Sequence, residues 1–356
     1  MTIGDFGGKT YFPTIGLRPA EMRALEELPE NTKDRILPII LFAPWVGSNS
    51  LEKSLERVVD AFGKRAFFLD LDTAYYSKGK PRDAVIEYEG IVGNEDNYFA
   101  LVEGIPQAIP VLRIEAATSY SIANQLVKLG ELDRNFLVRI RKGAFPTGDI
   151  SILKTLFDTG QSNYVISIDC EWSDDVLSSE QWVAQIFQQF IQFDARSPVV
   201  VSLSSFPKTF SEISGAKSLP IDSRILFNNI KRRFGNQFVV LYGDWATTKP
   251  REDKIARTPA ARIDYATVDQ WVIHRKKDEW DYLDAAKELM KSKYWNKGLH
   301  VWGSLMIEKT ANGDVSGITT PTKNVAARIN LHLHQQAWFD DPNLMLNTDD
   351  PYIDDL

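Results

Sequence analysis

The feature of this sequence that most restricts its fold is a regular alternation between two kinds of segment. Short runs rich in β-branched and aromatic residues recur along the chain, and a stretch with helical signals follows each of them. Eight such runs occur, at residues 11–16, 36–43, 66–72, 109–115, 136–141, 164–171, 199–204 and 238–244. A strand followed by a helix, repeated at a spacing of roughly 30 residues, predicts an α/β protein of the (β/α)8, TIM-barrel-like class.

The main alternative for this alternation is an open, doubly wound parallel sheet. Proteins of that class usually carry a glycine-rich phosphate-binding loop after the first strand. Here the sequence Gly-Leu-Arg-Pro-Ala-Glu follows the first strand, at residues 16–21, and it contains no such loop. The barrel is therefore the preferred interpretation.

The chain is expected to comprise three parts. Residues 1–245 hold the barrel core, residues 246–339 form an excursion and helices that pack on the barrel, and residues 340–356 form an acidic tail. In the C-terminal part we expect a helix over 278–295 and a strand-like piece over 299–307. A last helix should begin at Thr320 and Pro321, which suit a cap and a first turn, and end near Trp338.

Composition excludes several classes of protein. The chain has 356 residues, of which 44% are hydrophobic and 25% charged, so it can bury a large core. A formal net charge of -7 argues against a generally basic nucleic-acid surface, and the single cysteine, Cys170, excludes an intrachain disulfide. The N-terminus lacks a signal peptide and no apolar stretch reaches about 18 residues, so we expect a cytoplasmic protein without membrane contact.

Polar residues are paired at the ends of most predicted strands. Side chains two apart on a strand share a face, and six of the eight strands end with such a pair. The pairs are Asp70 and Asp72, Arg113 and Glu115, Arg139 and Arg141, Asp169 and Glu171, Ser202 and Ser204, and Tyr242 and Asp244. The alternate positions are mostly apolar and would meet the helices, which leaves the pairs for the barrel mouth, where barrels build their sites.

These pairs suggest specific roles for a polar pocket. Asp169 and Glu171 are the best candidates for an acid/base pair or for metal ligands, and Asp244 could join them as a catalytic group. Asp70 and Asp72 could hold a divalent cation such as Mg²⁺ or Mn²⁺ through their oxygens. A substrate phosphate could be held by the side chains or amides of Arg113, Arg139, Arg141, Ser204 and Ser205. The alternative is a closed ionic network in which the arginines neutralise the neighbouring carboxylates.

Several segments resemble a known family. Tyr11 to Leu28, followed by Asp34 to Ile40, is similar to the opening of the "beta protein" family of bacteria, phages and mobile elements. The segments Ser204–Pro207, Tyr242–Ala246 and Arg328–His334 resemble its later strand ends and its closing helix. The resemblance covers nearly the whole chain. It implies a barrel-like fold and a setting in phage-host conflict, and it brings no established reaction.

Three hypotheses for function follow. The first is a defence-associated protein that binds or processes a phosphate-containing ligand, such as a nucleotide or nucleic acid, at the barrel mouth; if it is an enzyme, a metal-dependent phosphodiester hydrolase is the expected class. The second is a non-catalytic recognition or scaffold subunit that binds a protein partner through the excursions at 73–97 and 246–277 or through the acidic tail. The third is a carbohydrate-active barrel, which would need two carboxylates facing each other across an open cleft.

Overall fold

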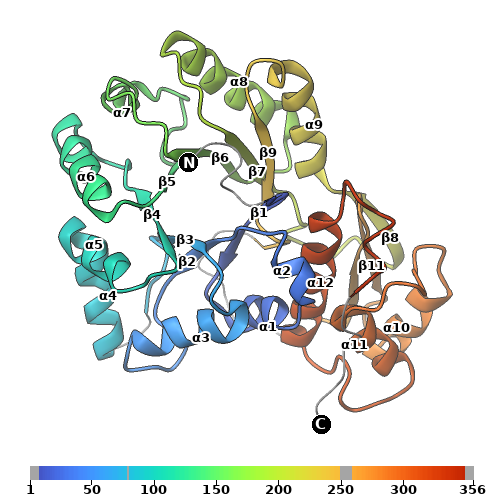
Figure 1. Cartoon of the computed structure of the whole chain (residues 1–356). Coiled ribbons are helices and arrows are strands. Elements are labelled where there is room, and N and C mark those ends of the chain that lie inside the picture. The colour runs from blue at the N-terminus through green and yellow to red at the C-terminus, as the bar shows by residue number, and fades with distance from the viewer. Residues whose placement is uncertain (1–7, 78–79, 249–258, 349–356) are drawn as a thin grey trace.

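A computed structural model of the chain describes residues 8–77, 80–248 and 259–348. Eight parallel strands close into a barrel in the order β1-β2-β3-β4-β5-β6-β7-β9, so the predicted TIM-barrel-like class is confirmed (Figure 1). The strands are β1 (Tyr11–Gly16), β2 (Ile39–Phe42), β3 (Phe67–Leu71), β4 (Ala108–Leu112), β5 (Phe136–Arg141), β6 (Tyr164–Trp172), β7 (Val199–Ser204) and β9 (Val240–Asp244). Each lies within or next to one of the eight runs expected from the sequence. Pairing of Tyr11 with Tyr242 closes the barrel between β1 and β9.

Helices cover the outside of the barrel. They are α1 (Pro19–Glu26), α2 (Glu30–Lys33), α3 (Glu52–Phe62), α4 (Asp83–Gly93), α5 (Glu95–Glu103), α6 (Ser119–Leu132), α7 (Lys154–Phe157), α8 (Val176–Gln192) and α9 (Asp222–Phe234), with a short 3₁₀ turn over Ser151–Leu153. Local signals set their starts: Pro19 occupies the first turn of α1, and Thr118 and Asp175 cap α6 and α8. No helix among the described residues is long and apolar enough to cross a membrane.

Two apolar clusters separate the inside of the barrel from its outer layer. The inner cluster takes alternate residues from the strands and contains Phe12, Leu37, Ile39, Leu41, Phe68, Val111, Leu137, Val165, Val200 and Trp245. The larger apolar cluster, outside the barrel, holds the other strand positions together with the helices. This alternation assigns every strand residue to the barrel interior or to the helical layer.

The C-terminal part adds a small sheet and three helices. Strands β8 (Gly215–Pro220), β10 (Ile263–Ala266) and β11 (Gln270–Arg275) form an antiparallel sheet in the order β10-β11-β8. Helices α10 (Tyr282–Lys291), α11 (Trp302–Ala311) and α12 (Pro321–Ala337) follow. Helix α12 begins at the expected Thr320 cap and packs against α1 and β10, where it serves as the helix of the last barrel unit (Figure 1).

The prediction of a strand-like piece over 299–307 is wrong. Most of it belongs to α11, which buries Trp302, Met306, Ile307 and Ala311. These positions recur with a helical period, and a short apolar run cannot by itself distinguish a buried helix from a buried strand. The small sheet was not predicted from the sequence either, because β8 contains Gly215 and Pro220 and has few strand-forming residues.

Gly303 permits the close crossing of α11 and α12. A Cβ added there would lie 2.5 Å from the carbonyl oxygen of Ala327 and 2.7 Å from Cγ of Leu331. Since backbone cannot move aside cheaply, we expect Gly303→Ala to lower the free energy of unfolding by about 1–3 kcal/mol. Gly130→Ala is the matched control, because a Cβ in that helix meets nothing within 4 Å and should stabilise by about 0.5–1 kcal/mol. Urea unfolding of both variants measures the difference; equal effects would contradict the tight crossing.

Candidate functional site

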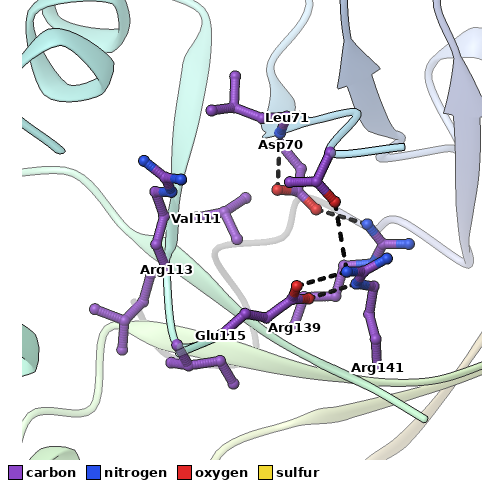
Figure 2. Close-up of a pocket in the computed structure, with 10 residues that line it drawn as sticks. Asp70, Leu71, Val111, Arg113, Glu115, Arg139 and Arg141 are labelled. Carbon is purple, nitrogen blue, oxygen red and sulfur yellow. Dashed lines mark hydrogen bonds and ion pairs between the residues drawn. The ribbon is translucent and has the colours of Figure 1, made fainter. Parts of the chain in front are cut away.

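Charged side chains gather inside the barrel at the C-terminal ends of β3, β5 and β6. Asp70, Arg139 and Asp169 each follow an inner-cluster residue of the same strand by two or four positions, so they point into the barrel. Figure 2 shows Asp70 and Arg139 facing one another across the mouth. The expected location of these three residues is therefore the observed one.

Arg139 is the centre of this group. Its Nη1 lies 2.6 Å from Oδ2 of Asp70, and its Nη2 and Nε lie 2.5 and 3.1 Å from Oδ2 of Asp169. The other oxygen of Asp169 accepts hydrogen bonds of 2.8 Å from the indole N–H of Trp245 and from the backbone N–H of Glu171. The side chain of Arg139 is 5% exposed and that of Asp169 is fully buried. We call Asp70, Arg139, Asp169 and Trp245 the mouth floor.

A second ion group lies above the floor, closer to solvent. Arg141 forms a bidentate ion pair with Glu115 (Figure 2). Its Nη1 also lies 3.2 Å from Oε1 of Glu171. Its Nη2 is 3.5 Å from the hydroxyl of Thr73. The side chain of Arg141 is 20% exposed, so solvent screens these pairs more than those of the floor.

Glu171 is held in an unusual backbone conformation. Its φ is 56°, and the register between β6 and β7 shifts between Asp169 and Trp172. Its Oε2 accepts a 2.8 Å hydrogen bond from the backbone N–H of Gly143. Burial, and then the charge of Asp169, raise the pKa of Glu171 above its usual value. A strained carboxyl with a raised pKa at a barrel mouth is typical of functional groups, although ion networks can produce the same shift.

Arg113 does not join the other two arginines. Strand β4 ends at Leu112, and the guanidinium of Arg113 points away from Arg139 and Arg141 (Figure 2). Its Nη2 donates a 2.6 Å hydrogen bond to the carbonyl of Val92. Arg113 thus lines the same small cavity as Arg139 and Arg141, but its guanidinium is turned away from theirs.

The serines and Asp72 are also engaged by the fold. The hydroxyl of Ser204 donates to the carbonyl of Thr248, while that of Ser205 accepts from the backbone N–H of Asp222, 3.2 Å away, at the start of α9. Asp72 follows β3, and its backbone N–H donates to Phe42 at 2.9 Å. Its side chain is buried. None of the three lines the small cavity between Asp70 and Arg141.

The placement of Asp244 in the barrel mouth is wrong. Leu241 of β9 packs against the inner cluster, and Trp245, directly after β9, belongs to it, so Tyr242 and Asp244 point outward into the helical layer. The sequence could not decide between these faces, because the short strand alternates polar and apolar residues and Gly243 has no side chain to mark its face.

Asp244 is instead the centre of a buried cluster that sequence reasoning missed. Its carboxylate accepts hydrogen bonds from the hydroxyls of Tyr11 and Tyr242 and from the N–H of Ala246, and it lies 2.6 Å from Nε2 of His332. We call Asp244, Tyr11, Tyr242 and His332 the outer cluster. The available signal was that polar residues such as Arg328, Asn330 and His332 alternate with Ile329, Leu331 and Leu333 in α12, so that no face of this helix is purely polar or purely apolar.

The outer cluster also perturbs ionisation. Burial alone would raise the pKa of Asp244, but the interaction with His332 and the hydrogen bonds from His332, Tyr11 and Tyr242 outweigh it and hold that pKa below its usual value. A neighbouring group ties the same helix to the turn after β9: Arg328 binds Asp264 at 2.6 Å and the hydroxyl of Thr247 at 2.9 Å. Helix α12 and the end of β9 are therefore joined by buried polar contacts.

Comparison with known proteins identifies the family. The sequence model of the family described as "Beta protein" matches residues 11–338. The chain belongs to the Beta protein family. It is 26% identical over 345 residues to "Protein beta" of Enterobacteria phage P4, an alignment that covers 93% of this chain and 94% of the phage protein. The resemblance inferred from short motifs is confirmed, and the matched region includes the mouth floor and the outer cluster.

The cavity between Asp70 and Arg141 at the mouth of this Beta protein family member is small. The cavity lined by Asp70, Thr73, Glu115, Arg139 and Arg141 has a volume of about 60 Å³. That is room for a few water molecules, whereas sites for drug-sized ligands typically measure roughly 300–1,000 Å³. Over the described ranges, no three His, Cys, Asp or Glu side chains are arranged to hold a metal ion, so Asp70 and Asp72 find no third ligand there.

Proposed function

We propose that this protein is a recognition or scaffold protein of phage-host conflict that binds a protein partner at its barrel mouth. The observation that carries the proposal is that exposed apolar side chains occur in the segments that follow four of the barrel strands, at the end of the barrel that holds the ion-paired floor. These side chains follow β2, β3, β4 and β6 and are Val46, Tyr76, Tyr120 and Leu177, which we call the mouth rim. Tyr120, 77% exposed, is the most accessible of them.

The mouth rim suits a protein partner. Exposed apolar residues that gather at one end of a molecule mark interaction sites, and tyrosine is enriched in protein interfaces because it pairs a large apolar ring with a hydroxyl. Tyr76 lies in the excursion at 73–97, one of the segments expected to bind a partner. The other two segments expected to bind a partner are 246–277 and the acidic tail. Residues 249–258 of the first and 349–356 of the second lie outside the described residues.

The charges below the rim favour recognition over anion binding. Arg139 already binds two carboxylates, and Arg141 binds two more. A phosphate would have to displace these partners and would meet more acidic than basic groups in the mouth. The phage setting is supported by the organism of the relative, Enterobacteria phage P4.

A second candidate function is binding or processing of a phosphate-containing ligand, such as a nucleotide. The observation that favours it is Glu171, whose positive φ and raised pKa suit a general acid or base. Partly exposed Arg141, next to Glu171, would receive the anion. A divalent cation such as Mg²⁺ or Mn²⁺ would then have to complete its coordination with ligand oxygens and water.

Site-specific photo-crosslinking tests the leading proposal. A photoreactive phenylalanine placed at Tyr120 or Tyr76 should yield one discrete protein adduct in cells of the natural host, because the mouth rim would lie against the partner. The matched control is Ile191, which is 42% exposed and lies at the C-terminal end of α8, the far end of the helix that carries Leu177. Adducts of the same mass and yield from Ile191, or none from the rim, would refute the proposal.

Melting temperature distinguishes the second candidate. A ligand that binds only the folded protein must raise it, by an amount that depends on ligand concentration relative to the dissociation constant. We expect no response to nucleotides, inorganic phosphate, Mg²⁺ or Mn²⁺ if the mouth serves protein recognition alone. A shift that disappears in Glu171→Gln, with the folding of that variant verified by circular dichroism, would instead establish the ligand site.

A further inference from the structure

Strand β8 lies at one edge of the small antiparallel sheet, beside the barrel (Figure 1). It pairs with β11 on one side, and within the described part of the chain the sheet order has no strand on its other side (Figure 1). Ala216, Lys217 and Ser218 are exposed, as is Pro220. A strand at such an edge presents unpaired backbone groups that can bind a further strand.

The register identifies which backbone groups are free. Leu219 is paired with Trp271, and the next pair continues the ladder, because the N–H of Ile221 donates to the carbonyl of Asp269 at 2.9 Å. In an antiparallel pair, alternate residues direct both backbone groups toward the partner strand. The backbone N–H and C=O groups of Leu219 and Lys217 therefore point toward β11, and those of Ala216 and Ser218 point toward the free edge.

The outward groups are available for pairing. Among the described residues, the N–H and C=O groups of Ala216 and Ser218 make no hydrogen bond outside the sheet. Pro220, the next outward position, has no N–H, which is where an edge strand tolerates proline. The free edge thus offers two donors, from Ala216 and Ser218, in a row with their carbonyls.

The charge at this edge indicates the kind of partner. Lys217 is the only charged residue of β8, and it is exposed. A second cation lies close by, since the ammonium of Lys293 is 5.1 Å from the ring of Tyr294, whose hydroxyl bonds Ser218. Two cations disfavour pairing with β8 of a second copy and favour a strand with an acidic residue.

A groove continues from the C-terminal end of β8. It has a volume of about 400 Å³, and its apolar lining includes Leu219, Ile221, Ile225 and Phe339. Ile225 is among the exposed large apolar side chains of the molecule. If a partner strand ran antiparallel to β8, its N-terminal end would lie beside the C-terminal end of β8. The partner residue just before the first paired position would then reach this groove.

We propose that the free edge of β8 binds an extended segment of a polypeptide partner by antiparallel β-strand addition. The segment carries an acidic residue opposite Lys217 and an apolar residue, four positions before it, in the groove beside Ile225. Backbone hydrogen bonds to Ala216 and Ser218 supply affinity, and the two side chains supply specificity. This surface is separate from the mouth rim and does not depend on it.

Fluorescence anisotropy with a labelled probe peptide tests the inference. The probe is an acetylated Leu-Thr-Val-Thr-Glu-Val-Thr peptide, in which glutamate falls opposite Lys217 and leucine enters the groove. We expect Ser218→Pro to weaken its binding about tenfold, because proline removes an outward donor without removing a bond to β11. Ser218→Ala is the matched control: it keeps the N–H, loses the same bond to Tyr294, and should bind the probe within about twofold of wild type.

A charge exchange gives a second measurement that does not depend on the proline variant folding. Lys217→Glu should weaken the glutamate probe about tenfold and restore binding to a probe with lysine at that position. Tyr120→Ser, a change in the mouth rim, should leave probe binding unchanged, so failure here is distinguishable from failure of the proposed function. No binding of the probe at millimolar concentration, equal binding to the Ser218→Pro and Ser218→Ala proteins, or no effect of the charge exchange would overturn the inference.

Discussion

Replacing Arg139 by methionine is expected to lower the free energy of unfolding by about 3–5 kcal/mol. The substitution keeps much of the side-chain volume but leaves Asp70 and Asp169 without their common cation. Asp169 is fully buried, so it cannot recover the lost interaction from water. Urea unfolding of wild type and variant at neutral pH gives the difference directly.

Arg141→Met is the matched control for this prediction. It removes a second arginine from the same strand and the same mouth, but its ion pairs are partly exposed to solvent. A partly exposed pair typically contributes about 0–1 kcal/mol. If both substitutions had the same small effect, the floor would be open to water, and the case for a ligand pocket at the mouth would gain strength. A large difference would support the closed network.

Replacing Asp244 by alanine is expected to have an effect of similar size, about 3–5 kcal/mol, through the outer cluster. The change leaves the buried hydroxyls of Tyr11 and Tyr242 and the ring of His332 without their common acceptor. Asp244→Asn is the control, because it retains one carbonyl oxygen and should cost less. Equal losses in the two variants would show that the carboxylate itself contributes most of the stability.

The pH dependence of this effect has a defined sign. The pKa of Asp244 is lower in the folded protein than in the unfolded chain. Its carboxylate therefore stabilises the fold above its unfolded pKa, near 3.9, and this contribution is lost as the pH falls through the lower folded value. The difference in unfolding free energy between wild type and Asp244→Asn should accordingly be largest near neutral pH and shrink below about pH 4. A difference that grew on acidification would contradict the assigned direction.

Two consecutive residues at the end of β9 connect the sites of these two sets of substitutions. Trp245 points inward and donates to Asp169 of the mouth floor, while Asp244 points outward and binds His332 on α12. These consecutive residues connect the C-terminal helix to the base of the mouth. The geometry of the mouth floor therefore depends on how α12 packs against the end of β9. Helix α12 is the last helix of the region that matches the Beta protein family.

Local patterns in the sequence were sufficient for the barrel. Strands and helices each have a characteristic spacing of apolar residues, and this spacing depends only on residues close together in the chain. Each barrel strand lies within or next to the run predicted for it. The same patterns located Asp70, Arg139 and Asp169 at the mouth. They also placed the helix that starts at Thr320, because a cap acts on residues next to it in the chain.

Tertiary structure alone decided which charges meet. Whether Arg139 would bind carboxylates or leave them open to a ligand depends on distances between strands that no single segment encodes. Asp244 points outward because its partner there is His332, 88 residues further along the chain. The short end of β9 alone is compatible with Asp244 pointing either into the barrel or out of it. Strand β8 likewise exists because β11 pairs with it. Its own residues have weak strand propensity, so a sequence read locally could not have found it.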